Sequence, residues 1–199
     1  MILWINGAFG SGKTTTAFEL NRRIENSFVY DPENVGYFIR KNAPQQFSKG
    51  DFQDIYLWRD MNYKMLKLIS AEYDGIVIAP MTLVNPKYYE EIITRLINDG
   101  IEVRHFILYA GRETILKRLK IRSFRGLGSE SFAVNSIDRC IYSFDNYIKD
   151  IKIITDDKKI DDVVEEIARK SNIDLLPDNR SETKKFIDRI GTLIKHIRS

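Results

Sequence analysis

Residues 7–14 read Gly7-Ala8-Phe9-Gly10-Ser11-Gly12-Lys13-Thr14 and match the pattern G-x-x-x-x-G-K-[ST] of a phosphate-binding loop. The apolar residues 2–5 before it predict a strand, and residues 14–24, which contain neither Gly nor Pro, predict a helix after it. In such a unit the loop N–H groups converge on phosphate oxygens, Lys13 reaches toward the β- and γ-phosphates, and the Thr14 hydroxyl can hold Mg²⁺. The stretch therefore predicts a site for a nucleoside triphosphate.

The composition limits the size and setting of the fold. A chain of 199 residues with 43% hydrophobic content can bury one sizeable core, so we expect one domain. The 31 basic and 28 acidic residues nearly balance, which argues against binding of nucleic acid. Cys140 is the single cysteine, which excludes an internal disulfide and suits a reducing cytosol. The sequence has no signal-peptide pattern and no run of about 18 apolar residues, so we expect a cytoplasmic protein.

Four further apolar runs predict strands, at residues 28–30, 75–80, 103–109 and 151–155. Residues 75–80 are continuously apolar, which is typical of a buried parallel strand. Helical patterns separate the strands, including a long amphipathic one over residues 53–72 and one that Pro86 opens and Gly100 ends. The alternation predicts an α/β fold, in which helices cover both faces of a parallel five-stranded sheet.

Candidate acceptor-binding residues follow the second and third strands. Asp31 ends the second strand, where it can act as a general base beside the phosphate loop, but Asp31 followed by proline is equally a good start for a helix. Glu33 follows closely, and Arg40 and Arg59 lie before the third strand, although an isolated helix arginine is more often solvated or ion-paired. The third strand ends near Thr82 without an acid, so Mg²⁺ would depend on Thr14, water, the nucleotide and Asp31 or Glu33.

A second group of candidates follows the fourth strand. Arg118 and Arg122 lie one turn apart on a helix over residues 113–122, and residues 123–131, with Arg125 among them, are rich in Gly and Ser. We expect a lid near residues 123–135 that excludes water and neutralises phosphoryl charge. The alternative is an exposed basic helix followed by a flexible loop.

The C-terminal extension, residues 177–199, stands apart from the nucleotide-binding domain expected over residues 1–176. Its pattern predicts an amphipathic helix. The apolar stripe comprises Phe186, Ile187, Ile190, Leu193, Ile194 and Ile197, and the basic side comprises Lys184, Lys185, Arg189, Lys195 and Arg198. Such a helix suits the surface of an anionic membrane, or it packs on its own domain or on a partner subunit.

Several segments together resemble the bacterial tunicamycin-resistance ATP-binding proteins. They are Trp4-Ile5-Asn6 with the phosphate loop, Tyr30-Asp31-Pro32-Glu33, Leu57-Trp58-Arg59, Pro80-Met81-Thr82 and Lys195-His196-Ile197-Arg198. The resemblance covers nearly the whole chain. It implies a P-loop kinase-like fold, ATP binding, protection against a nucleoside antibiotic, and peripheral membrane attachment through the C-terminal helix.

The layout is also similar, more distantly, to shikimate, chloramphenicol and nucleotide kinases. This likeness implies that Asp31 contacts the acceptor hydroxyl, that Arg118 stacks on adenine and that Arg122 serves the lid. The missing acid after the third strand departs from many of these kinases. The leading hypothesis is an ATP- and Mg²⁺-dependent phosphotransferase acting on a hydroxyl of tunicamycin or a related nucleoside antibiotic, with Lys13, Asp31 and Arg122 as its catalytic residues. The rival is a protein that sequesters the drug and uses ATP only as a conformational ligand.

Overall fold

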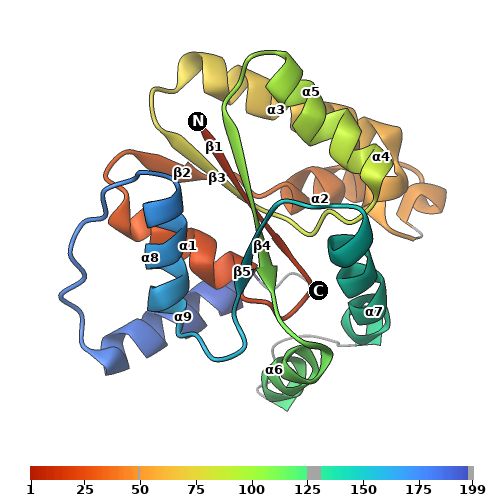
Figure 1. Cartoon of the computed structure of the whole chain (residues 1–199). Helices are drawn as coiled ribbons and strands as arrows, with labels where there is room; N and C mark the ends of the chain where they lie inside the picture. The colour runs from red at the N-terminus through yellow and green to blue at the C-terminus, as the bar shows by residue number, and fades with distance from the viewer. Residues whose placement is uncertain (49, 125–130, 197–199) are drawn as a thin grey trace.

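The structure, a computed structural model, describes residues 1–48, 50–124 and 131–196. The strands are β1 (Ile2–Gly7), β2 (Ser27–Val29), β3 (Ile76–Pro80), β4 (Val103–Tyr109) and β5 (Ile151–Ile154). All neighbouring strands pair in parallel, in the order β2-β3-β1-β4-β5 (Figure 1). The predicted parallel five-stranded sheet is therefore confirmed.

The helices connect and cover the strands. They are α1 (Lys13–Arg23), α2 (Glu33–Asn42), α3 (Tyr56–Glu72), α4 (Pro86–Tyr89), α5 (Arg95–Asn98), α6 (Arg112–Phe124), α7 (Ser131–Asn146), α8 (Ile160–Lys170) and α9 (Glu182–His196). A π-helical turn over Glu90–Thr94 joins α4 to α5, so that the predicted helix over residues 86–100 is nearly continuous. Short 3₁₀ turns lie at Gln45–Ser48 and Phe52–Asp54.

The two faces of β1 show why both sides of the sheet are covered. Successive side chains of a strand point to opposite faces, so Ile2 and Trp4 join the core beneath α3, whereas Leu3 and Ile5 join the core beneath α1 and α8. All four side chains are fully buried, which explains the continuous apolar pattern of this central strand. A third apolar cluster holds α6 and α7 against the end of β4.

The long helix α3 begins three residues later than the sequence pattern indicates. The carboxylate of Asp51 accepts a hydrogen bond of 3.0 Å from the backbone N–H of Gln53 and starts a 3₁₀ turn instead. Ile55 then adopts an extended conformation, and α3 starts at Tyr56. The predicted start at residue 53 is therefore wrong by three residues, because the side chain of Asp51 caps a separate 3₁₀ turn before the helix.

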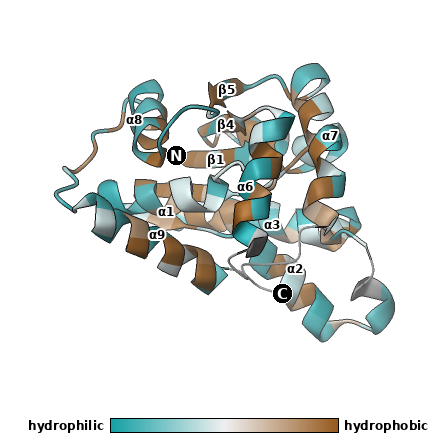
Figure 2. Cartoon of the chain, turned by 90° about the horizontal axis from the view of Figure 1, so that it is seen from below, coloured by the Kyte–Doolittle hydropathy of each residue, from teal (hydrophilic) through white to brown (hydrophobic). Residues whose placement is uncertain are grey.

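The C-terminal helix α9 packs on its own domain, one of the alternatives that its sequence left open. It runs alongside α1 (Figure 2), and the ring of its His196 lies 4.3 Å from the ring of Phe18. The side turned to the body is the charged one, because Lys185 and Arg189 are mostly covered while Phe186, Ile187 and Ile194 are 52, 57 and 58% exposed. Ile197 and Arg198 lie outside the described residues.

Two further predictions concern the lid near residues 123–135 and the boundary of the C-terminal extension. Residues 125–130 of the expected lid, including Arg125, lie outside the described residues, and residues 131–135 are the first turn and a half of α7. The division between a domain over residues 1–176 and an extension over residues 177–199 stays a prediction. Within the described ranges, no helix has the length and apolar character needed to cross a membrane.

Candidate functional site

The phosphate loop lies between β1 and α1 in the geometry that its sequence predicts. Gly7, Gly10 and Gly12 have φ angles of 148°, 81° and 101°, which residues with side chains rarely adopt. A Cβ atom at Gly7 would lie 2.7 Å from the carbonyl oxygen of Leu108 in the neighbouring strand β4. The backbone therefore requires glycine at this turn, and it directs the free N–H groups at the start of α1 toward a bound anion.

Lys13 lies over the loop rather than away from it. Its Nζ atom donates hydrogen bonds of 3.0 Å to the carbonyl oxygens of Gly7 and Ala8. Burial lowers the pKa of Lys13 to about 8, and among the nearby charges Glu33 acts to raise it and Arg122 to lower it. Charged side chains of α1, α2 and the end of α6 therefore influence one another electrostatically.

The two candidate carboxylates lie at the start of α2. The Oδ1 atom of Asp31 accepts a hydrogen bond of 3.0 Å from the backbone N–H of Glu33, so the structural alternative weighed for Asp31 is present. Tyr37 donates a hydrogen bond of 3.2 Å to Oε2 of Glu33. Burial and the neighbouring charge of Asp31 raise the pKa of Glu33, against the opposing effect of Lys13. Of these two residues, Glu33 is the one whose charge acts on the ammonium group of Lys13.

The two arginines of α6 have different surroundings. The charge of Arg122 acts to lower the pKa of both Lys13 and Glu33. The Nη1 atom of Arg118 donates a hydrogen bond of 3.0 Å to Oγ1 of Thr155, and its Nη2 atom donates to the carbonyl oxygen of the same residue. Arg118 is therefore fixed against the chain that leaves β5.

The remaining acceptor-binding candidates have partners in the fold. Arg40 donates a hydrogen bond of 2.8 Å to the carbonyl oxygen of Gly50, and the buried hydroxyl of Thr82 donates one of 2.8 Å to the carbonyl oxygen of Gly7. Arg59 is buried, pairs with Glu91 and lies 4.3 Å from the ring centre of Tyr88. Acceptor binding by Arg40, Arg59 and Thr82 stays a prediction.

Asp51 and Arg139 are charged residues near Arg40 that sequence reasoning missed. Burial raises the pKa of Asp51, while the hydrogen bond from Gln53 and the charges of Arg139 and Arg40 lower it. Arg139 belongs to α7. It lies 88 positions after Asp51 in the sequence (139 − 51), and only the fold brings the two residues near each other. No spacing rule could have joined the two residues.

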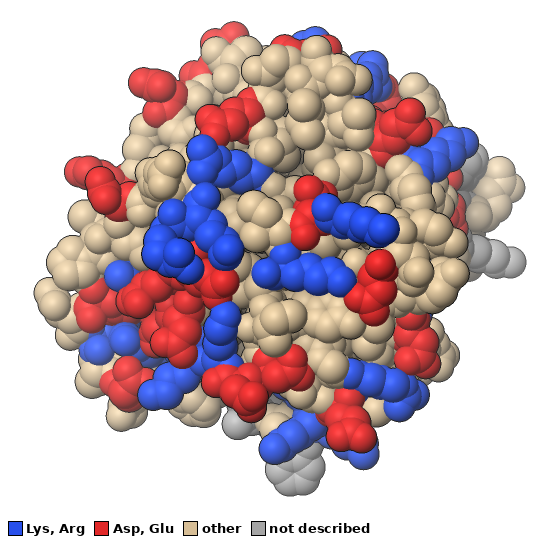
Figure 3. All heavy atoms as spheres, in the orientation of Figure 1, with Lys and Arg blue, Asp and Glu red and all other residues tan. Residues whose placement is uncertain are grey.

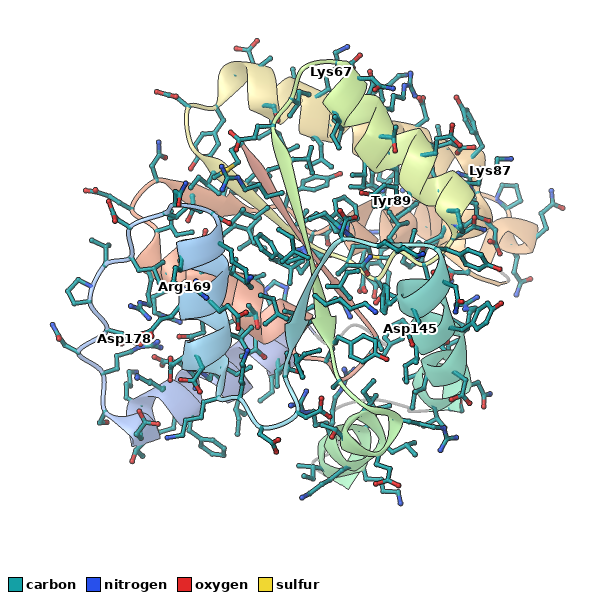
Figure 4. The ribbon with its side chains drawn as sticks, viewed as in Figure 1. Lys67, Lys87, Tyr89, Asp145, Arg169 and Asp178 are labelled. Carbon is teal, nitrogen blue, oxygen red and sulfur yellow. The ribbon has the colours of Figure 1, made fainter. Side chains whose placement is uncertain are left out.

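A buried polar network supports the loop from beneath. Asn6 accepts a hydrogen bond of 2.8 Å from the backbone N–H of Gly7, and its Nδ2 atom lies 3.0 Å from Nε2 of His105. The Nδ1 atom of His105 lies 2.8 Å from Asp150, which also accepts a hydrogen bond of 2.7 Å from the hydroxyl of Tyr89. Tyr89 projects from the end of α4 (Figure 4). The sequence signal for this network is a polar residue, Asn6, in an otherwise apolar central strand.

A cavity of about 450 Å³ continues from the phosphate loop toward α8 and α9. This volume lies within the usual range for small-molecule sites. Its walls come from the phosphate loop, α1, α6, the β5–α8 connection and both C-terminal helices. The lining residues are Gly10, Ser11, Gly12, Thr16, Arg118, Thr155, Lys158, Lys159, Ile160, Asp161, Val163, Glu182 and Arg189.

Oxygen groups that suit a metal ion lie at the start of α1 and beside the C-terminal helices. The hydroxyl of Thr14 lies in the first turn of α1, beside phosphate-binding N–H groups, and suits Mg²⁺ as an oxygen ligand. Among the described residues, Glu19, Asp161 and Asp178 form a group of three carboxylates whose oxygens lie within 4.8 Å of one another, and Asp161 also lines the cavity. That group pairs with Arg180 and Arg189, so a Mg²⁺ ion would depend on Thr14 and on oxygens of the nucleotide.

No protein-family model and no curated protein matches the chain. Among solved structures, the tunicamycin resistance protein of Deinococcus radiodurans is similar, with 28% identity, a TM-score of 0.73 and coverage of 89% of this chain and 99% of that one. Shikimate kinase from Bacteroides thetaiotaomicron (16% identity, TM-score 0.59) and the APS kinase of Mycobacterium tuberculosis (14%, 0.57) share the fold over 87 and 86% of this chain and 99 and 96% of theirs. The predicted P-loop kinase fold and the resemblance to tunicamycin resistance proteins are confirmed.

Proposed function

We propose that this protein is an ATP-dependent phosphotransferase that acts on a hydroxyl group of tunicamycin or a related nucleoside antibiotic. The observation that carries the proposal is a phosphate loop with Lys13 lying over it, in a chain similar to a tunicamycin resistance protein over 89% of its length. The charges of Glu33 and Arg122 also act on the pKa of Lys13. Phosphoryl transfer needs positive charge at the γ-phosphate and a carboxylate near the acceptor. The site offers both.

Each residue then has a definite role. The N–H groups of Gly7–Thr14 hold the β- and γ-phosphates, Lys13 neutralises their charge, and Thr14 is the residue of this chain that would hold Mg²⁺. Arg118 faces the adenine, and Arg122 covers the transferring group. A bound Mg²⁺ ion supplies further charge neutralisation at the phosphates.

The chemical step balances without any further reagent. The acceptor hydroxyl oxygen forms a bond to the γ-phosphorus, the bond between that phosphorus and the bridging oxygen of ADP breaks, and the hydroxyl proton passes to Asp31. Asp31 accepts the hydrogen bond from the N–H of Glu33 through Oδ1, which orients its carboxylate. Glu33 contributes charge beside it.

The second candidate function is sequestration of the drug with ATP as a conformational ligand. The feature that favours it is the end of β3, where Thr82 is buried and bonded to Gly7 and no carboxylate follows the strand. A protein that only binds the drug needs no carboxylate at that position.

One experiment separates the two functions. The protein is incubated with ATP, Mg²⁺ and tunicamycin, and the drug is then weighed by mass spectrometry. A mass gain of one phosphoryl group, absent with the Lys13→Met variant, supports the transferase. An unchanged drug, under conditions in which ATP binding is measured directly, would exclude transfer and favour sequestration.

We also propose that α9 makes peripheral contact with an anionic membrane. Its outer side exposes Phe186, Ile187 and Ile194, and its basic residue Lys195 is exposed as well. An exposed apolar stripe beside lysines suits the boundary between headgroups and acyl chains.

A further inference from the structure

The cavity next to the phosphate loop has a wall that belongs to the C-terminal extension. Gly10 and Gly12 line one end, and Arg118 and Thr155 line a side. Glu182 and Arg189, both from α9, line the same cavity, although they lie 170 or more positions after Gly12 (182 − 12 = 170). The phosphate end of the site and the C-terminal helix therefore border one continuous space.

Arg189 is held in place at this wall by charges of the body. Its Nη2 atom lies 2.7 Å from Oδ1 of Asp161 and 3.6 Å from Oε2 of Glu19, and its side chain is 18% exposed. Acidic and basic side chains gather side by side over this region of α8 and α9 (Figure 3). The guanidinium is thus positioned by ion pairs, and it does not depend on solvent to fix its orientation.

Three polar atoms of residues that line the cavity are buried and have no hydrogen-bond partner among the described residues. They are Nε of Arg189, Oγ of Ser11 and Oγ1 of Thr16, and Thr16 is fully buried. Buried donors and hydroxyls are nearly always paired in native proteins, since leaving one unpaired destabilises the fold. Three such atoms around one cavity indicate that a ligand with hydrogen-bonding groups belongs there.

The rest of the lining indicates what kind of ligand this is. Ile160 and Val163 supply apolar surface, Arg118 supplies a planar cation, and the phosphate loop closes the end. Asp31 and Glu33 do not line the cavity, so it is separate from the acceptor side. A flat heterocycle with polar edges, linked to phosphates, matches this combination.

We propose that α9 forms a wall of the nucleoside end of the nucleotide site and that Arg189 donates a hydrogen bond to the ribose or base of the bound nucleoside triphosphate. This inference rests on the proposed function in assuming that a nucleotide occupies the phosphate loop. It adds a specificity-determining residue from the C-terminal extension. Because the nucleotide contacts α9, nucleotide binding stabilises the packing of that helix on the domain. By linkage, the packed helix raises the nucleotide affinity by the same factor.

The test compares two ligands that share the phosphates but not the nucleoside. Isothermal titration calorimetry measures the affinity for ATP and for inorganic tripolyphosphate, each with Mg²⁺. Arg189→Ala is expected to weaken ATP binding about 10-fold and to leave tripolyphosphate binding unchanged, since one hydrogen bond to a charged donor is lost. Lys184→Ala is the matched control, because Lys184 belongs to the same helix, is 61% exposed and pairs with Asp188 outside the cavity.

A second measurement uses the unaltered protein, so that it does not depend on a variant that loosens α9. Hydrogen–deuterium exchange should slow across residues 182–196 when ATP is bound and should stay the same with tripolyphosphate. Unchanged ATP affinity in Arg189→Ala, equal losses for both ligands, or no ATP-dependent protection of α9 would each overturn this inference while leaving the proposed function intact. Failure of the unaltered protein to bind ATP would overturn both.

Discussion

The side-chain amide of Asn6 lies 3.0 Å from the imidazole Nε2 of His105, directly beneath the phosphate loop. The same amide donates a hydrogen bond of 2.7 Å to the carbonyl oxygen of Leu83 and accepts one of 2.9 Å from its N–H group. With the further hydrogen bond from the N–H of Gly7, every polar position of this amide is occupied. One side chain of β1 therefore fixes the loop to β4 and to the segment after β3.

Replacing Asn6 by alanine should destabilise the protein and weaken nucleotide binding. The substitution leaves buried groups of Gly7, Leu83 and His105 unpaired, so we expect a loss of about 3 kcal/mol in the free energy of unfolding. Urea denaturation measures this value. Asn146→Ala is the control, because exposed Asn146 bonds only to the carbonyl oxygen of Tyr142, and it should cost less than about 0.5 kcal/mol. Equal effects of the two substitutions would contradict the support role of Asn6.

ATP binding should take up protons near pH 8 because of Lys13. Burial lowers the pKa of Lys13 to about 8, so the side chain is partly neutral at that pH. Triphosphate charge favours the ammonium form and raises this pKa, which requires uptake of roughly half a proton at pH 8 and almost none through Lys13 at pH 6.5. Calorimetry in buffers of different ionisation enthalpy measures the uptake. The Lys13→Met variant should lack this contribution, and identical proton uptake in both proteins would disprove the assignment.

Asp31→Asn should separate catalysis from capping. Asparagine can accept the hydrogen bond from the N–H of Glu33 as aspartate does, so α2 should keep its start and the melting temperature should change little. Loss of the base should slow phosphoryl transfer to the drug about 100-fold or more. Asp51→Asn makes the same change at an equivalent hydrogen bond, from Gln53, and controls for weaker capping. Full transfer activity in Asp31→Asn would remove Asp31 from the mechanism.

Arg180 should be the strongest attachment of the C-terminal segment. Its Nη2 atom pairs with Glu19, whose side chain is 3% exposed, and lies 2.7 Å from Asp178. Arg180→Ala leaves these carboxylates buried without that partner and should cost about 3 kcal/mol, measured by urea denaturation. Lys184→Ala, at a pair in which the lysine is 61% exposed, should cost about 0.5 kcal/mol or less.

The loss of unfolding free energy caused by Arg180→Ala should also depend on pH. The hydrogen bond from Arg180 holds the pKa of Asp178 far below its usual value of 3.8, although burial opposes this effect. A carboxyl group with a lowered pKa stabilises the fold fully above pH 3.8 and loses that contribution as the pH falls toward the folded-state pKa. The difference between the two proteins should therefore shrink on acidification below about pH 4. A difference that grows there would contradict this pairing.

The exposed side of α9 should bind anionic vesicles in a salt-dependent manner. Co-sedimentation of the unaltered protein should fall as salt rises, since each basic contact contributes about 1 kcal/mol near the surface. Phe186→Ser combined with Ile187→Ser removes exposed apolar surface and should reduce co-sedimentation without lowering the melting temperature. Equal sedimentation of this variant, of a protein ending before Arg180 and of the full chain across the salt series would exclude the anchor.

Local patterns were sufficient for the phosphate loop and for the order of strands and helices. Residues 7–14 specify their own backbone, because glycines are needed where φ is positive and because the N–H groups at the start of α1 have no partner within the helix. The continuous apolar runs of β1 and β3 specify buried parallel strands, since such strands face packed helices on both sides. The capping role of Asp31 was also readable from the sequence, because the acceptor and the donor are two residues apart.

Only the tertiary structure decided how distant charges are paired. The amphipathic pattern of α9 predicted an apolar stripe and a basic side. Which of them faces the rest of the domain depends on Glu19, Asp161 and Asp178, three carboxylates that lie outside α9 in separate segments of the chain. Likewise, the charge of Arg139 acts on Asp51, and Arg189 reaches the cavity beside Gly12, through packing of elements far apart in the chain. Periodicity reports which residues of one helix share a face, whereas ion pairing and cavity walls depend on the positions of several elements at once.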